Sequence, residues 1–168
     1  MSKAYLGLGT NMGNCMENLK NAIDAIDLLP LTKVLQLSKV YKTKPVGYAD
    51  QDDFYNMVIE VETELNPDNL LGACLGVEAG MGRFRIIKNG PRIVDIDLLL
   101  YDDFTSDSQT LVLPHPRMFE REFVLRPLLD IDFQNNFIDR EKLKSLLTGN
   151  GIELYSEKII ENGVLCIT

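Results

Sequence analysis

Two aspartates, Asp95 and Asp97, stand one residue apart at the start of the apolar run VDIDLLLY, residues 94–101. In a β-strand the side chains of residues i and i+2 point to one face, about 6.6 Å apart along the strand. Two carboxylates this close repel each other, and partial burial adds to the cost. A magnesium ion removes both penalties, because it binds through one or two carboxylates plus substrate phosphates. The pattern therefore indicates either a magnesium site or the solvated face of an amphipathic strand.

A stretch of positive charge lies just before the two aspartates. Residues 79–94 contain no acidic side chain but include Arg83, Arg85, Lys88 and Arg92, in a chain whose net charge is −8. A local positive region in an acidic protein favours a compact anion such as a polyphosphate over a nucleic acid, which needs a broad basic surface. Metal-binding acids beside phosphate-binding cations are the two halves of a nucleotide site. We therefore predict a nucleotide site and no nucleic-acid partner.

The glycine-rich segment GLGTNMGN, residues 7–14, does not match a standard phosphate-binding loop. Its glycines miss the GxGxxG spacing by one position, and the chain has no GxxxxGK[ST] loop. We interpret the segment as the turn that joins a first strand to a first helix, with Thr10 or Asn11 helping to cap that helix.

The elements that must position these residues follow from hydrophobic periodicity. The predicted strands are residues 4–9, 33–43, 54–65 and 94–101. The predicted helices are residues 15–29 and 67–80, the second with Asn66 as its cap. This order predicts an α+β fold, a ferredoxin-like β-α-β-β-α-β plait with an antiparallel sheet. After it we expect an extra C-terminal helix at residues 140–147 and a hairpin in which ELYSEKII and VLCIT are joined at Glu161-Asn162-Gly163.

Length and composition set broad bounds on the protein. A chain of 168 residues, 45% hydrophobic and 25% charged, predicts a single globular domain over residues 1–168. We expect no membrane partner and no signal peptide, since no apolar run approaches the roughly 18 residues of a membrane span and MSKAYLGLGTNMGN is polar early. Cys15, Cys74 and Cys166 are widely spaced, so reduced thiols in a cytoplasmic protein are expected. A monomer or weak homo-oligomer is the expected state.

Five segments resemble, in order, the signature of a single enzyme family. They are GLGTNMGN, YKTKPVG, FYNMVIEVET, KNGPRIVDIDLL and LVLPHPRMFEREFVLRPL, within residues 4–131. Their order and spacing are similar to those of 6-hydroxymethyl-7,8-dihydropterin pyrophosphokinase, a family of folate biosynthesis. The resemblance implies an α+β plait. It also implies transfer of the pyrophosphoryl group of ATP to the hydroxymethyl oxygen of the dihydropterin, with release of AMP.

The resemblance implies roles for individual residues. Asp95 and Asp97 would hold two magnesium ions, with ATP as co-substrate and with Arg83 and Arg92 also acting in catalysis. Other residues similar to nucleotide-binding positions of the family are Glu78, Arg85, His115 and Arg121. Residues similar to its pterin-binding positions are Thr43, Pro45, Val46, Gly47, Asn56 and Phe123.

Phe54 joins the pterin residues on bottom-up grounds, because it shares one strand face with Asn56. An aromatic ring beside an amide suits a flat heterocycle that is rich in donors and acceptors. Taken singly, Phe54 and Phe123 are more often core residues than ligand contacts. Asn89 departs from the family, since many members have there a tryptophan that closes over the substrates. Loops 44–53 and 81–92 are expected to close over ATP before the pterin reacts.

Two functions of other classes also fit these residues. One is a ferredoxin-like module that binds a metabolite without catalysis, which predicts no magnesium dependence and no AMP. The other is a metal-dependent nuclease or phosphohydrolase, which predicts cleavage without a pterin acceptor.

Overall fold

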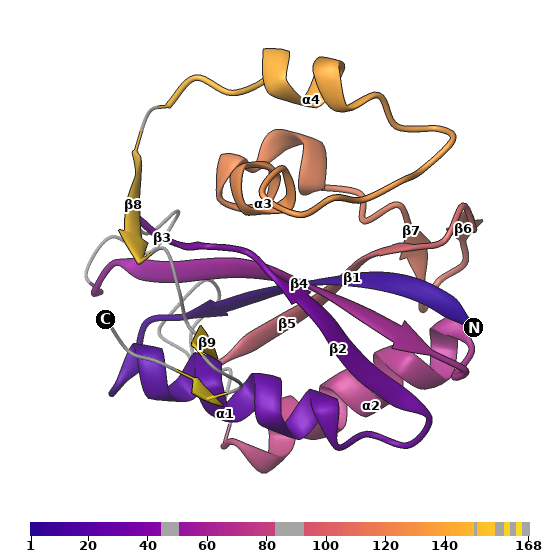
Figure 1. The fold of residues 1–168 in the computed structure, drawn as a ribbon, viewed down its shortest axis with the longest axis horizontal. Coiled ribbons are helices and arrows are strands. Elements are labelled where there is room, and N and C mark those ends of the chain that lie inside the picture. The colour runs from indigo at the N-terminus through magenta and orange to yellow at the C-terminus, as the bar shows by residue number, and fades with distance from the viewer. Residues whose placement is uncertain (45–50, 83–92, 150, 157–159, 162–163, 166–168) are drawn as a thin grey trace.

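The main sheet is antiparallel and lies in the middle of the molecule (Figure 1). The computed structural model describes residues 1–44, 51–82, 93–149, 151–156, 160–161 and 164–165. Within them, six strands form this sheet in the order β5-β1-β4-β3-β8, and β2 also pairs with β4. The strands are β1 (Ser2–Thr10), β2 (Thr32–Leu37), β3 (Val40–Thr43), β4 (Phe54–Thr63), β5 (Asp95–Tyr101) and β8 (Ile152–Ser156). The predicted α+β class with an antiparallel sheet is confirmed.

Helices cover both faces of the sheet, and each face has its own apolar core (Figure 1). On one face lie α1 (Cys15–Asp27) and α2 (Pro67–Gly80), whose Leu19 and Leu70 pack against Leu6 of β1. On the other face lie α3 (Glu122–Leu128) and α4 (Arg140–Ser145), with Leu125 buried against Val58 of β4. Among the helices of the described residues, none has the length and apolar character to cross a bilayer.

The first helix begins at Cys15, as the sequence predicts, but its cap is a different residue from the one expected. Asn14 is its cap, and its side chain accepts a hydrogen bond from the backbone N–H of Glu17 at 3.1 Å. The expectation that Thr10 or Asn11 caps this helix was wrong, since Thr10 ends β1. The Asn11 amide nitrogen instead donates to the side-chain oxygen of Gln51 at 2.7 Å. It thereby ties the end of β1 to the segment that precedes β4.

The strand predicted at residues 33–43 is two strands, β2 and β3, which both pair with β4. Ser38 separates them. Its backbone N–H donates to the carbonyl of Val58 at 2.9 Å, and its hydroxyl accepts from the Val58 N–H at 2.8 Å. The hydroxyl thus replaces a backbone carbonyl of the ladder, so the pairing with β4 is interrupted at this point.

The C-terminal part also differs from the expectation. The first part of ELYSEKII belongs to β8 and pairs with β3 at the edge of the main sheet. Among the described residues of this run, Ile160 alone pairs with VLCIT, opposite Leu165. A shorter hairpin follows, made of β9 (Ile160–Glu161) and β10 (Val164–Leu165). Three elements between β5 and α3 were not predicted: β6 (Ser106–Asp107), β7 (Val112–Leu113) and the 3₁₀ turn η1 (Met118–Glu120).

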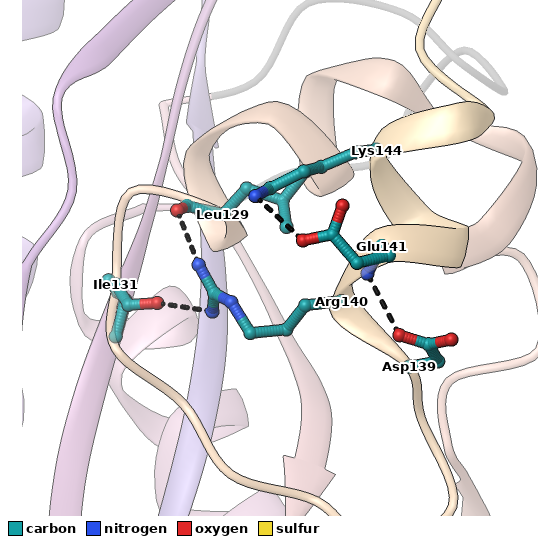
Figure 2. Close-up of polar contacts among 6 residues, drawn as sticks. All are labelled: Leu129, Ile131, Asp139, Arg140, Glu141 and Lys144. Carbon is teal, nitrogen blue, oxygen red and sulfur yellow. Dashed lines mark hydrogen bonds and ion pairs between the residues drawn. The ribbon is translucent and has the colours of Figure 1, made fainter.

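The extra helix near residue 140 is confirmed as α4, and Arg140 anchors it (Figure 2). The guanidinium of Arg140 donates to the carbonyls of Ile131 at 2.8 Å and Leu129 at 2.9 Å. Its carbon lies 4.8 Å from the ring centroid of Phe133. These contacts satisfy carbonyls just after α3 and hold α4 over that helix.

Candidate active site

Two glycines of β1 form the floor of the site. Gly7 and Gly9 of β1 lie opposite Asp97 and Asp95 of β5, and Gly9 also lies opposite Asn56 of β4. The central strand therefore contributes no side chain between the amide on one neighbour and the carboxylates on the other. β1 continues to Thr10, so Gly9 lies in a strand, in agreement with the strand predicted at residues 4–9.

A cavity of about 240 Å³ lies above this floor, between the sheet and the segment that leads through η1 into α3. Seven of the predicted site residues line it: Thr43, Phe54, Asn56, Asp95, Asp97, Arg121 and Phe123. The structure thus brings together residues from β3, β4, β5 and α3 that are far apart in the sequence. The cavity is also lined by residues that the sequence did not single out, among them Lys44, Arg117, Glu120 and Val124.

Within this cavity the amide of Asn56 has a fixed orientation. Its nitrogen donates to the hydroxyl of Thr43 at 2.9 Å, and both side chains are buried. The amide oxygen consequently points to the opposite side, over Gly9. Arg121 lies with its guanidinium carbon 5.5 Å from the ring centroid of Phe123, so the cation stacks on one of the two aromatic residues of the cavity.

A second cavity, of about 350 Å³, lies on the other side of the two carboxylates. Glu78 and His115, both predicted to contact the nucleotide, line it together with Asp95 and Asp97. The rest of its lining is largely apolar and includes Leu71, Leu75, Leu111, Val112 and Pro116. The two aspartates therefore form a wall that both cavities share.

Glu78 is buried and holds the strand that carries the aspartates. Its carboxylate accepts a hydrogen bond from the backbone N–H of Ile96 at 2.7 Å. β5 is an edge strand that pairs only with β1 among the described strands, so an N–H on its outer side has no strand partner. Since Ile96 lies between Asp95 and Asp97, this hydrogen bond fixes the backbone from which both carboxylates project.

His115 approaches the carboxylates as a neutral ring. Burial lowers its pKa, Arg121 and Arg117 lower it further, and Asp95 acts in the opposite direction. The Nδ1 atom accepts a hydrogen bond from the backbone N–H of Arg117 at 3.3 Å, so the proton of the neutral ring is on Nε2. Nε2 lies 3.9 Å from Oδ1 of Asp97. The contact is therefore one between an N–H dipole and a carboxylate, not an ion pair.

The donor set of the site fits magnesium. Asp95 and Asp97 offer hard oxygen ligands from one strand face, beside the neutral His115. Within the described residues, no group of three or more His, Cys, Asp or Glu side chains could hold a metal ion. Two carboxylates with an open side suit magnesium, which takes its other ligands from water and substrate phosphates.

Several predicted site residues lie outside the described residues. They are Pro45, Val46, Gly47, Arg83, Arg85 and Arg92, as well as Asn89. Of the residues that the sequence did not assign, Arg117 and Glu120 line the first cavity beside Arg121. The motif LVLPHPRMFEREFVLRPL contains all three residues. The charged residues close to His115 in this motif could therefore have indicated Arg117 and Glu120 as site residues.

Comparison with known proteins decides the family. A sequence model of 7,8-dihydro-6-hydroxymethylpterin-pyrophosphokinase (HPPK) matches residues 5–133. The chain belongs to this family. The HPPK of Bacillus subtilis is 37% identical over 155 residues, which are 92% of this chain and 91% of that one. The HPPK of Methylorubrum extorquens is 44% identical over 131 residues, 78% of this chain and 83% of that one.

Longer relatives agree with this assignment, and solved structures share the fold. The folic acid synthesis protein fol1 of Schizosaccharomyces pombe is 40% identical over 169 residues, covering 96% of this chain. This chain spans only 23% of that protein and 20% of the fol1 of Pneumocystis carinii. The wild-type HPPK-DHPS of Plasmodium falciparum, solved with pterin and p-hydroxybenzoate, has a TM-score of 0.68 at 17% identity, over 91% of this chain and 45% of that one. That likeness shows the same fold.

Proposed function

We propose that this chain transfers the β,γ-pyrophosphoryl group of ATP to the hydroxymethyl oxygen of 6-hydroxymethyl-7,8-dihydropterin in folate biosynthesis. The hydroxyl oxygen forms a bond to the β-phosphorus of ATP, the bond between the α,β-bridging oxygen and that phosphorus breaks, and the hydroxyl proton is released. The products are the pterin diphosphate and AMP. Membership of the HPPK family supports this reaction.

The observation that carries the proposal is the position of Asp95 and Asp97 between two cavities. The first cavity has the residues that suit a flat heterocycle, namely Phe54, Asn56 and Phe123. The second is mostly apolar and suits the base of a nucleotide. A triphosphate that leads from the second cavity towards the first would pass the two carboxylates, where transfer to the pterin takes place.

The proposal gives a role to the following residues of the site. Asp95 and Asp97 would hold two magnesium ions, which supply charge neutralisation and alignment of the phosphates when bound. Arg121 stabilises the negative charge of the transferred group, and the Nε2–H of His115 orients Asp97 or donates to a phosphate oxygen. Thr43 and Asn56 bind the pterin edge and Phe54 and Phe123 its faces. Arg83, Arg85 and Arg92 are proposed as further phosphate contacts, and Pro45, Val46 and Gly47 as pterin contacts.

We also infer the finer description of the fold and of the molecule. The order β5-β1-β4 with β2 and β3 beyond, and α1 and α2 on one face, supports a ferredoxin-like plait over a single domain of residues 1–168. The free thiols of Cys15 and Cys74 support a cytoplasmic location. A monomer or weak homo-oligomer is proposed for its state.

The test is incubation with ATP, Mg²⁺ and the hydroxymethyldihydropterin, followed by separation of the nucleotides. We expect AMP, and we expect Asp95→Ala or Asp97→Ala to lower turnover by more than about a hundredfold with an unchanged fold. ADP as the product would indicate another kinase class. Nucleotide cleavage that does not depend on the pterin would favour a phosphohydrolase, and binding without any product would favour a metabolite-binding module.

A further inference from the structure

The amide of Asn56 leaves one buried hydrogen-bonding atom facing the first cavity. The residue is 6% exposed, and its Nδ2 donates a hydrogen bond to the hydroxyl of Thr43. Among the described residues, none donates a hydrogen bond to its Oδ1. A buried acceptor without a partner is rare in folded proteins, and such an atom is completed by a donor on a ligand. Oδ1 is therefore available to accept a hydrogen bond from a ligand in this cavity.

Gly9 decides where that oxygen can be. The two residues are direct partners in the antiparallel pair β1–β4. A Cβ atom on Gly9 would lie 2.9 Å from Oδ1 of Asn56, which is shorter than such atoms approach one another. The position of the amide oxygen thus requires that residue 9 has no side chain.

Gly7 shows that this requirement is local. It lies on the same strand and the same face, two residues away, and also lines the cavity. A Cβ atom there would meet only the side chain of Leu99, at 3.5–3.7 Å, which is an ordinary van der Waals distance. Of the two glycines in the floor, only Gly9 is in conflict with a polar group of the site.

We propose that Gly9 is a positioning residue for pterin recognition: its missing side chain lets Asn56 hold Oδ1 towards a donor of the ring. The inference rests on the proposed function, because it takes the pterin as the ligand of the first cavity. With alanine at residue 9, the end of the Asn56 side chain has to turn away, since the clash is with its amide oxygen. The backbone of β1 and β4 can stay in place, so the fold is retained.

The experiment is a double-mutant cycle on Gly9→Ala and Asn56→Ala, with Gly72→Ala as the matched control. Gly72 lies in α2, and a Cβ there has no heavy atom within 4 Å. Three quantities are measured for each variant: the KM values for the pterin and for ATP, the Kd of the pterin with Mg²⁺ and a non-hydrolysable ATP analogue, and the thermal midpoint. The Kd does not depend on turnover, so it tests this inference even if the wild type forms no AMP.

We expect Gly9→Ala to raise the pterin KM and Kd about tenfold or more, the size of one lost hydrogen bond to a buried acceptor. The KM for ATP should change less than about twofold, and Gly72→Ala should match the wild type in both KM values and in the Kd. In the Asn56→Ala background, Gly9→Ala should have almost no further effect, because the oxygen that it displaces is gone.

Three results would overturn the proposal. The first is an unchanged pterin KM and Kd in Gly9→Ala. The second is an equally large effect in the Asn56→Ala background, because the added methyl group would then obstruct the ring directly. The third is loss of the folded state in Gly9→Ala, since the clash is with a side-chain tip only. A wild type that binds the pterin without making AMP would instead refute the proposed function and leave this inference standing.

Discussion

Glu78 offers the sharpest test of how the fold positions the two aspartates. It is 4% exposed, and it accepts the N–H of Ile96 on the open edge of β5. Glu78→Ala leaves that N–H without this acceptor, and an unsatisfied buried donor costs about 1–3 kcal/mol. Because the second cavity borders both residues, water can reach the amide, so we expect the lower part of that range, about 1–2 kcal/mol.

The effect on turnover should exceed the effect on stability. Ile96 lies between Asp95 and Asp97, so a shift of its amide moves both carboxylates, and small misplacements of catalytic groups lower rates strongly. We expect kcat to fall about tenfold or more in Glu78→Ala. Glu78→Gln keeps an acceptor oxygen of the same reach and should lose less than about 1 kcal/mol, because the hydrogen bond becomes a neutral one.

The assay combines urea denaturation followed by circular dichroism with initial rates of AMP formation. The control is Glu141→Gln, an exposed residue of α4 that pairs with Lys144 at the surface. The reasoning is refuted if the free energy of unfolding of Glu78→Ala is within about 0.5 kcal/mol of the wild-type value and its kcat is within twofold. The hydrogen bond from β5 to Glu78 would then not position the site.

Three further predictions concern other parts of the chain. Arg140→Ala removes two charge-assisted hydrogen bonds (Figure 2), so it should lower the free energy of unfolding in urea by about 2–3 kcal/mol. The control Lys144→Ala should change the free energy of unfolding by less than about 0.5 kcal/mol. Burial acts to raise the pKa of Glu122, but hydrogen bonds from Thr148 and Gly149 outweigh it and the pKa is lowered. The contribution of the Glu122 carboxylate to stability is therefore complete at neutral pH and lost in acid. The difference in the free energy of unfolding between wild type and Glu122→Gln should shrink from pH 7 to pH 4. A difference that stays constant over this range would contradict the prediction. Burial, followed by the charge of Glu78, raises the pKa of Cys74 to about 12, so iodoacetamide at pH 8 should leave this thiol unmodified until urea is added; rapid labelling of the native protein would refute this.

Sequence periodicity predicted the elements that carry most of the site, for a physical reason. α1 and α2 bury one face each, so their apolar residues repeat with the helical period. β1, β4 and β5 are buried on both faces, so they are recognised as apolar runs. The division at Ser38 was not predictable in this way, because it depends on a partner in β4, Val58, that lies twenty residues along the chain. α3 gave no signal either, since it has seven residues, contains Pro127 and lacks a side-chain cap.

The site residues likewise include some that spacing within one strand predicts and one that depends on the pairing of two strands. The spacing of Asp95 and Asp97, and of Phe54 and Asn56, placed each pair on one face, and the cavity lining agrees with both. The role of Gly9 was missed, because the glycines of β1 were compared with a nucleotide-binding loop. Their function follows from the register between β1 and β4, which brings together residues far apart in the chain.

The most direct test of the account is a crystal structure with Mg²⁺, a non-hydrolysable ATP analogue and the hydroxymethyldihydropterin. The account predicts metal ions bound by Asp95 and Asp97, the pterin ring in the first cavity beside Asn56 and the base in the second. Metal bound elsewhere, or both ligands on one side of the two carboxylates, would contradict it.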